Sequence, residues 1–241
     1  MRVIGVLAAV SAVAAFAACT TSDRAASDSA AMTDTGAMAA DTGMANVATS
    51  DPDINVAGGG LPAGFMARTD RADAPISGAK YERSGDAWEV TTGPAHILYS
   101  PTTVGNDSYS ASATIEQLEA PKHPEAYGIF IGGRDLDRPS QAYTYFLVRA
   151  NGDMLVKARE GDRTRDVIKW TASADVPKAD ASGKATYALS AQVTGDAVKF
   201  MVNGKQVGSV SKAGLPTDGI AGLRINHNLH VKASPVTIAG G

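Results

Sequence analysis

Apolar and polar residues alternate along most of the chain beyond residue 79, with the period of two that is typical of β-strands. Twelve segments have this character, and no long segment has helical periodicity. We predict strands at residues 87–92, 96–100, 108–118, 126–133, 142–150, 153–160, 164–170, 185–194, 197–203, 205–210, 219–226 and 230–238.

Short glycine-containing turns join several of these segments. ANGD at 150–153, TGD at 194–196 and VNGK at 202–205 are tight-turn signals, and the Asn203-Gly204 pair is the strongest of them. Many short strands joined by hairpins predict an all-β fold, an antiparallel β-sandwich or barrel.

Alternation also assigns the faces of the strands. Within 197–203 the residues Val198, Phe200 and Val202 share one face, which we assign to the core. Within 219–226, Leu223 and Ile225 point inward, as Phe146 does in 142–150. The opposite, polar face then carries Tyr143, Tyr145, Arg149, Arg224 and Asn226.

This polar face has the residue types that bind sugars. Aromatic rings stack on sugar rings, while arginine and asparagine satisfy sugar hydroxyls. We therefore take Tyr143, Tyr145, Arg149, Arg224 and Asn226 as a candidate ligand site. The alternative is an ordinary solvated sheet face with cross-strand tyrosine–arginine pairs.

The N-terminus has the pattern of an export signal. Arg2 precedes an uncharged apolar run that ends in small residues, which indicates a signal peptide at 1–18. The sequence FAAC at 16–19 resembles a bacterial lipobox, and the resemblance implies that Cys19, the single cysteine, carries lipid. The residue after Cys19 is Thr20 and not aspartate. In lipoproteins of this type the absence of aspartate at this position favours the outer membrane, with the protein facing the periplasm or at the cell surface. The alternative is an ordinary signal peptide cut near a chance cysteine.

Residues 19–60 differ in composition from the rest. They consist mostly of Ala, Ser, Thr, Asp, Gly and Met and contain no aromatic residue, so they cannot bury enough apolar surface to fold. We predict a lipidated, disordered linker with a span of roughly 35 Å. Residues 61–241 then form one β-sandwich domain. Its 20 basic and 19 acidic residues nearly balance, so we expect no nucleic-acid partner.

The order of segments in the C-terminal half resembles a known superfamily. YGIFIGGRDL, YTYFLVRANGDMLVKAREG, VKFMVNGKQVGSV and DGIAGLRINHNLHVKASPVTI are similar to the concanavalin A-like, or laminin G-like, jelly-roll proteins. That superfamily includes lectins, glycanases, adhesion modules and bacterial 3-keto-disaccharide hydrolases, and the tail looks like that of the last family. The aromatic-Glu-hydrophobic-Gln strand usual in that family is absent from the sequence.

Candidate catalytic and metal residues are few. The Glu-x-Asp-x-Glu strand by which β-glucanases of this fold cleave sugars does not occur. Asp135 and Asp137, in a predicted loop, offer two oxygen ligands for a structural calcium. His227 and His230 lie three residues apart, on opposite faces of an extended strand, so only a turn between them would let both bind one ion.

The sequence thus predicts a membrane-tethered lipoprotein with a non-catalytic, lectin-like sandwich that binds a saccharide or cell-envelope glycan. Two alternatives remain open at this point. One is a sugar-active enzyme of the 3-keto-disaccharide hydrolase type, and the other is a structural or adhesion module. The oligomeric state is open as well.

Overall fold

The structure is a computed structural model that describes residues 60–71 and 73–240. The predicted signal peptide 1–18, Cys19 and nearly all of the predicted linker 19–60 lie outside the described residues. Within 60–71 and 73–240 no helix has the length and apolar character that a membrane crossing requires.

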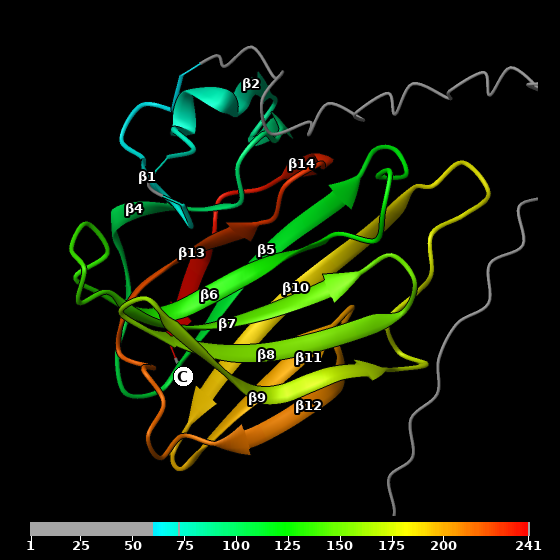
Figure 1. Cartoon of the computed structure of the whole chain (residues 1–241). Coiled ribbons are helices and arrows are strands. Elements are labelled where there is room, and N and C mark those ends of the chain that lie inside the picture. Colours follow the sequence, from blue (N-terminus) through cyan, green and yellow to red (C-terminus); the bar gives the residue numbers. More distant parts are fainter. Residues whose placement is uncertain (1–59, 72, 241) are drawn as a thin grey trace, which may run out of the picture. The chain divides into compact units, whose positions relative to one another are not determined.

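Two antiparallel sheets make up the domain, as the alternation predicted (Figure 1). The first contains seven strands in the order β1-β4-β13-β6-β7-β8-β9. Its strands are β1 (Met66–Thr69), β4 (His96–Gly105), β6 (Ala126–Arg134), β7 (Ala142–Arg149), β8 (Asp153–Glu160), β9 (Arg163–Ala172) and β13 (Gly219–Ile225).

The second sheet contains eight strands, in the order β12-β11-β10-β5-β14-β3-β2, with β15 also paired to β5. In Figure 1 the strands β6 to β9 run in front of β10, β11 and β12. A short 3₁₀ helix, η1 (Ile76–Gly78), precedes β2. The strands are β2 (Lys80–Ser84), β3 (Ala87–Thr91), β5 (Tyr109–Gln117), β10 (Ala185–Thr194), β11 (Ala197–Val202), β12 (Lys205–Ser211), β14 (His230–Ala233) and β15 (Thr237–Gly240).

Most predicted strands are present, and the differences have local causes. The segment predicted as one strand at 230–238 is two, β14 and β15, because Pro235 has no N–H to donate to a ladder. Both strands pair with β5, which continues past the interruption. The strands β1 and β2 were not predicted, because they are four and five residues long and rich in charge.

The core lies between the sheets and is formed by the residues that the alternation placed inside. Val198, Phe200, Val202, Leu223 and Ile225 are all at most 1 % exposed. Phe146 of the first sheet meets Phe200 of the second with ring centroids 5.2 Å apart, so the two faces interlock. The predicted Asn203-Gly204 turn joins β11 to β12, with φ of 51° and 79°, which the preferred two-residue hairpin turn requires.

Candidate functional site

The register of the first sheet brings four polar or aromatic side chains together on its outer face. Tyr143 and Tyr145 alternate along β7, and Tyr143 is paired with Arg159 on β8. Arg224 on β13 pairs with Gly128 on β6, which has no side chain. The Arg224 guanidinium therefore reaches across β6 and lies 5.8 Å from the Tyr145 ring centroid, while that of Arg159 lies 5.9 Å from Tyr143.

A carboxylate from the N-terminal part of the domain joins these side chains. Arg224 Nη2 donates to Asp70 Oδ2 at 2.5 Å, and Arg159 Nη2 lies 3.4 Å from Asp70 Oδ1. Asp70 directly follows β1. Burial disfavours the charged form of Arg224, but Asp70 and the two tyrosines oppose this, and the pKa of Arg224 stays above its ordinary value. We call Asp70, Tyr143, Tyr145, Arg159 and Arg224 the sheet-face cluster.

The two rings of the sheet-face cluster are buried rather than open. Tyr143 is 1 % exposed, Tyr145 7 % and Arg224 5 %, whereas 29 % of the Asp70 side chain is exposed. Burial raises the pKa of both tyrosines, so their hydroxyls stay protonated at neutral pH. Solvent thus contacts the sheet-face cluster mainly at its charged side chains, and the two tyrosine rings are buried beneath them.

The sheet-face cluster holds more hydrogen-bond donors than its own carboxylate uses. Nε and Nη1 of Arg224 and Nε of Arg159 are buried and have no hydrogen-bond partner among the residues that the structure describes. Buried donors are normally paired, because each unpaired one loses its solvation without compensation. The arrangement therefore favours a ligand group that carries oxygen acceptors.

The structure does not bring the five predicted ligand residues into one place. Tyr143, Tyr145 and Arg224 lie together, but Arg149 lies at the C-terminal end of β7, with its guanidinium carbon 3.7 Å from the Trp170 ring centroid. Asn226 lies beyond the end of β13 and donates from Nδ2 to Glu125 Oε2 at 3.2 Å.

Two members of the sheet-face cluster were not predicted. Arg159 carries the same alternation signal as the tyrosines, since Val156 and Ala158 are core residues of its strand and Arg159 is on the other face. Asp70 had no comparable signal, because it lies in an irregular segment and meets Arg224 across 154 positions of sequence.

The predicted calcium loop is a tight turn between β6 and β7. Asp135 has a φ of 49°, and its Oδ2 accepts a hydrogen bond from Ser140 Oγ at 3.1 Å. The Asp135 carbonyl accepts a further bond from the Arg138 N–H at 2.8 Å. Calcium binding by Asp135 and Asp137 stays a prediction.

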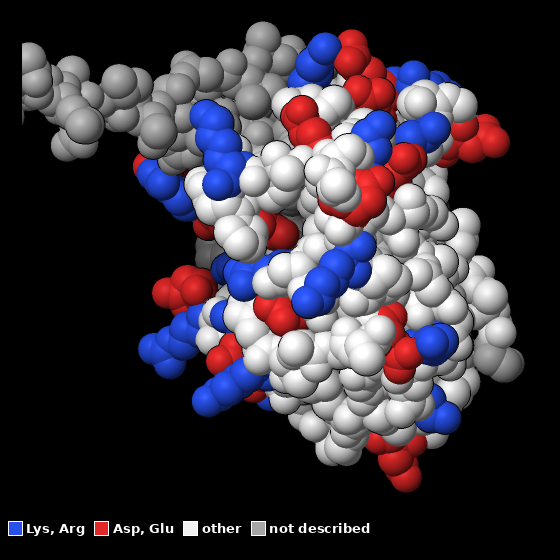
Figure 2. All heavy atoms as spheres, turned by 90° about the vertical axis from the view of Figure 1, so that its right-hand side faces the viewer, with Lys and Arg blue, Asp and Glu red and all other residues white. Residues whose placement is uncertain are grey.

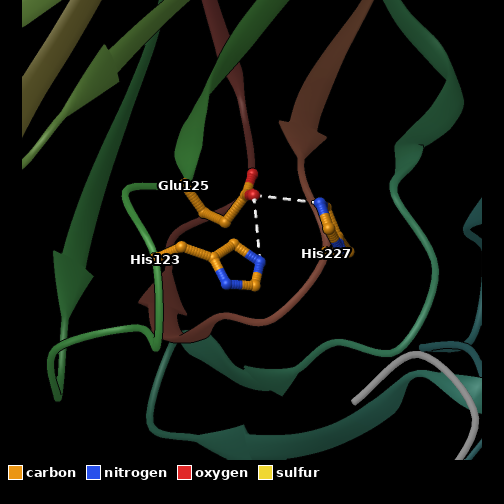
Figure 3. Close-up of side chains that lie close together, drawn as sticks. All are labelled: His123, Glu125 and His227. Carbon is orange, nitrogen blue, oxygen red and sulfur yellow. Dashed lines mark ion pairs between the residues drawn. The ribbon is translucent and has the colours of Figure 1, made fainter. Parts of the chain in front are cut away.

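A second cluster of side chains lies at one end of the sandwich (Figure 3). His123 and Glu125 precede β6, and His227 follows β13; the atoms they offer to a metal all lie within 4.8 Å of one another. His227 Nε2 is 2.9 Å and His123 Nε2 is 3.7 Å from Glu125 Oε1. Among the residues that the structure describes, this is the group of three His, Cys, Asp or Glu side chains whose geometry suits a metal ion.

His230 does not join His227, although a bend at 227–228, with Asn228 at a φ of 56°, replaces the extended strand on which the predicted separation rested. Its Nε2 lies 2.7 Å from Glu89 Oε1, and its Nδ1 lies 3.3 Å from Glu119 Oε1. The pairing of His227 with His123 was not predicted because the two are 104 positions apart in the sequence, and only the adjacency of β6 and β13 brings them together.

The outer face of the second sheet carries a groove of about 570 Å³. Small hydroxyl side chains line it, among them Ser112, Ser190 and Thr237, and no aromatic ring does. On the side of the domain shown in Figure 2, basic and acidic side chains are intermixed. We take the sheet-face cluster as the better candidate site, because its buried guanidinium nitrogens have no hydrogen-bond partner among the described residues.

Comparisons with known proteins identify the fold. No protein-family model matches the chain, and no curated protein matches it in sequence. The structure is similar to the carbohydrate binding module CBM66 from Bacillus subtilis, with a TM-score of 0.53, 13 % identity, and coverage of 73 % of this chain and 96 % of that one.

Two further solved structures are similar. The Ca²⁺-bound exoplasmic/lumenal domain of VIP36 gives a TM-score of 0.52 at 9 % identity, covering 79 % of this chain and 88 % of that one. A Bacillus subtilis protein of unknown function with a galectin-like fold gives 0.50 at 11 % identity, with 73 % and 89 % covered. At such identities the likeness concerns the fold alone, and it confirms the predicted one: the domain is an all-β, concanavalin A-like and galectin-like jelly-roll sandwich of two antiparallel sheets.

Proposed function

We propose that this domain is a lectin-like module that binds a saccharide through the sheet-face cluster. The observation that carries the proposal is Arg224, a buried guanidinium beside two tyrosine rings. Two of its nitrogens, Nε and Nη1, have no hydrogen-bond partner in the described part of the chain. Two similar structures support it: one is described as a carbohydrate binding module, and one structure of the VIP36 exoplasmic/lumenal domain is a Ca²⁺/Man2-bound form.

The chemistry of the cluster matches a saccharide. Hydroxyl and carboxylate oxygens accept hydrogen bonds from guanidinium groups, while Asp70 accepts bonds from sugar hydroxyls. Because Asp70 and Arg159 are the more exposed members, the ligand approaches over them and meets Arg224 beneath.

The proposed module does not catalyse hydrolysis. A retaining or inverting glycosidase needs two carboxyl groups that flank the bond, one of them able to give up a proton. Asp70 is held by two guanidinium groups, which suits a fixed acceptor. The sugar-active enzyme and the adhesion module remain the alternatives that the experiment below separates.

We further propose that the chain is an exported bacterial lipoprotein of the outer membrane. Support comes from the sequence alone: the export signal, the lipobox-like FAAC and the single cysteine. The linker 19–60 then lets the saccharide-binding domain work at a distance from the lipid.

The test is a glycan array with the full chain, with and without calcium, followed by a hydrolysis assay on each glycan bound. Arg224→Lys keeps the charge but removes the guanidinium fork, and we expect it to weaken binding about 10- to 100-fold, the value of one or two charge-assisted hydrogen bonds. Arg149→Lys is the matched control, since it makes the same change outside the cluster and should leave binding intact. Thermal unfolding of each variant verifies the fold.

Each other outcome points elsewhere. Equal effects of Arg224→Lys and Arg149→Lys would remove the sheet-face cluster as the site. Turnover of a bound glycan would favour the enzyme, and an array without any bound glycan would favour an adhesion or structural role. Calcium dependence would return attention to Asp135 and Asp137.

A further inference from the structure

The positions of His123, Glu125 and His227 follow from the pairing of two neighbouring strands. β6 begins where β13 ends, and the Asn226 N–H donates to the Ala126 carbonyl at 3.1 Å. The loop before β6 and the loop after β13 are therefore held side by side. Figure 3 shows both imidazole rings directed at one carboxylate oxygen of Glu125.

The spacing of the ligand atoms suits a tetrahedral metal ion. Zinc bonds of 2.0–2.2 Å place neighbouring ligand atoms about 3.3 Å apart. The two distances to Glu125 Oε1, 2.9 and 3.7 Å, lie on either side of that value. A hydrogen bond accounts for the shorter contact but not for the longer one, which exceeds hydrogen-bonding distance.

The carboxylate of this group is held as metal ligands usually are. Glu125 is 9 % exposed, and its second oxygen accepts a hydrogen bond from Asn226 Nδ2 at 3.2 Å. A hydrogen bond of this kind orients a ligating carboxylate and leaves its other oxygen free for the ion. A buried carboxylate also needs a compensating charge, and a divalent cation supplies one.

We propose that His123, Glu125 and His227 bind a divalent transition-metal ion, with zinc as the best fit. Two imidazoles and one carboxylate form a donor set for zinc and its neighbours rather than for calcium or magnesium, which prefer oxygen ligands throughout. Three protein ligands leave one tetrahedral position for water or a ligand. His123 is the most exposed of the three, and a pocket of about 230 Å³ borders it and Glu125.

The experiment is a zinc titration of the full chain, purified in detergent and stripped with a chelator, in competition with a chromophoric indicator. We expect one zinc per chain. Asn226→Ala, which removes only the supporting hydrogen bond, should weaken zinc binding 10- to 100-fold. His123→Ala and His227→Ala remove ligands and should weaken it more than Asn226→Ala does.

His230→Ala is the matched control. His230 also lies between two carboxylates, but they contact its two different ring nitrogens, so those contacts cannot converge on one ion. Its removal should leave the zinc affinity unchanged. Zinc should also raise the thermal midpoint of the wild type and of His230→Ala, and of neither ligand variant.

A wild type without stoichiometric zinc overturns the proposal, as does zinc binding that survives both His123→Ala and His227→Ala. If His227→Ala does not fold, the exposed ring of His123 makes His123→Ala decisive by itself. Saccharide binding is measured separately, so either proposal can fail while the other stands.

Discussion

Among single residues, His96 has an environment that restricts its protonation state between pH 4 and 6.5. It is fully buried at the start of β4, where Nδ1 donates to the Pro94 carbonyl at 2.8 Å and Nε2 accepts from the Tyr81 hydroxyl. Both ring nitrogens are thus engaged in the neutral form of the imidazole. Burial lowers the pKa of His96 from 6.5 to about 4, with the charge of Arg224 acting in the same direction.

This shift makes the stability of the domain sensitive to acid. As the pH falls through 6.5 the unfolded chain takes up a proton at His96, while the folded chain does so only near 4. The contribution of neutral, buried His96 to the free energy of unfolding is therefore complete above pH 6.5. It is lost as the pH falls from 6.5 to 4, and the loss amounts to about 3 kcal/mol. We expect His96→Gln to show a flatter dependence of the free energy of unfolding on pH across this window.

Urea unfolding at a series of pH values measures this dependence. If His96→Gln is too unstable to compare, NMR of the wild-type imidazole provides the test, since the ring should stay neutral down to about pH 5. Protonation of His96 near pH 6.5 would contradict the prediction.

At the scale of elements, glycine is required at two positions, Gly204 and Gly128, for two different physical reasons. Gly204 has a φ of 79° in the β11–β12 turn, and an added Cβ would meet nothing within 4 Å. Gly128 lies in β6, outside the left-handed region, but an added Cβ would come within 1.9 Å of the Phe146 carbonyl oxygen on β7. The turn requires glycine for its left-handed backbone conformation, whereas the sheet requires it because β7 leaves no space for a side chain at this position of β6.

We therefore expect Gly128→Ala to destabilise the domain more than Gly204→Ala. A side chain at Gly204 costs about 1 kcal/mol through the left-handed conformation alone. At Gly128 the colliding atom belongs to the backbone of β7, so two strands must separate, at a cost of about 3 kcal/mol. Denaturant midpoints of the two variants and the wild type measure the difference, and equal losses would contradict it.

At the scale of the whole molecule, sequence reasoning recovered the sandwich because its signals are local. Alternation within a strand gave the core positions Phe146, Phe200 and Leu223, and the Asn203-Gly204 pair gave a hairpin. The faces of Tyr143, Tyr145 and Arg224 follow from the same rule. The burial of the two tyrosines does not, because it depends on packing against residues of other elements, among them Tyr99 and Phe130.

The proposed metal site of His123, Glu125 and His227 shows the same limit of sequence-based prediction more clearly. Nothing near His123 in the sequence indicates His227, and the two meet because β6 and β13 are neighbours in a sheet whose order departs from chain order. Strand order depends on long-range pairing, which periodicity within one segment does not report.

The proposed membrane anchor is tested by Cys19→Ser. We expect this variant to leave the membrane pellet for the soluble fraction, because a buried acyl chain contributes about 0.8 kcal/mol per CH₂ group and the variant cannot carry one. The wild type should stay in the pellet after a high-salt wash, since salt screens only charges. Release of the wild type by salt would contradict a lipid anchor.

The edge strands of the two sheets affect how copies of the domain associate at high concentration. The strands at the ends of the two strand orders, β1 and β9 in the first sheet and β2 and β12 in the second, each carry at least one lysine or arginine, whereas β15, which pairs with β5 outside that order, carries no charge. A second copy that added its own strand at one of these four edges would have to strip the charged side chains of water. Open strand edges are the usual starting point of aggregation, and charged side chains are a common protection against it. The four charged edge strands thereby oppose edge-to-edge association of the domain at high concentration.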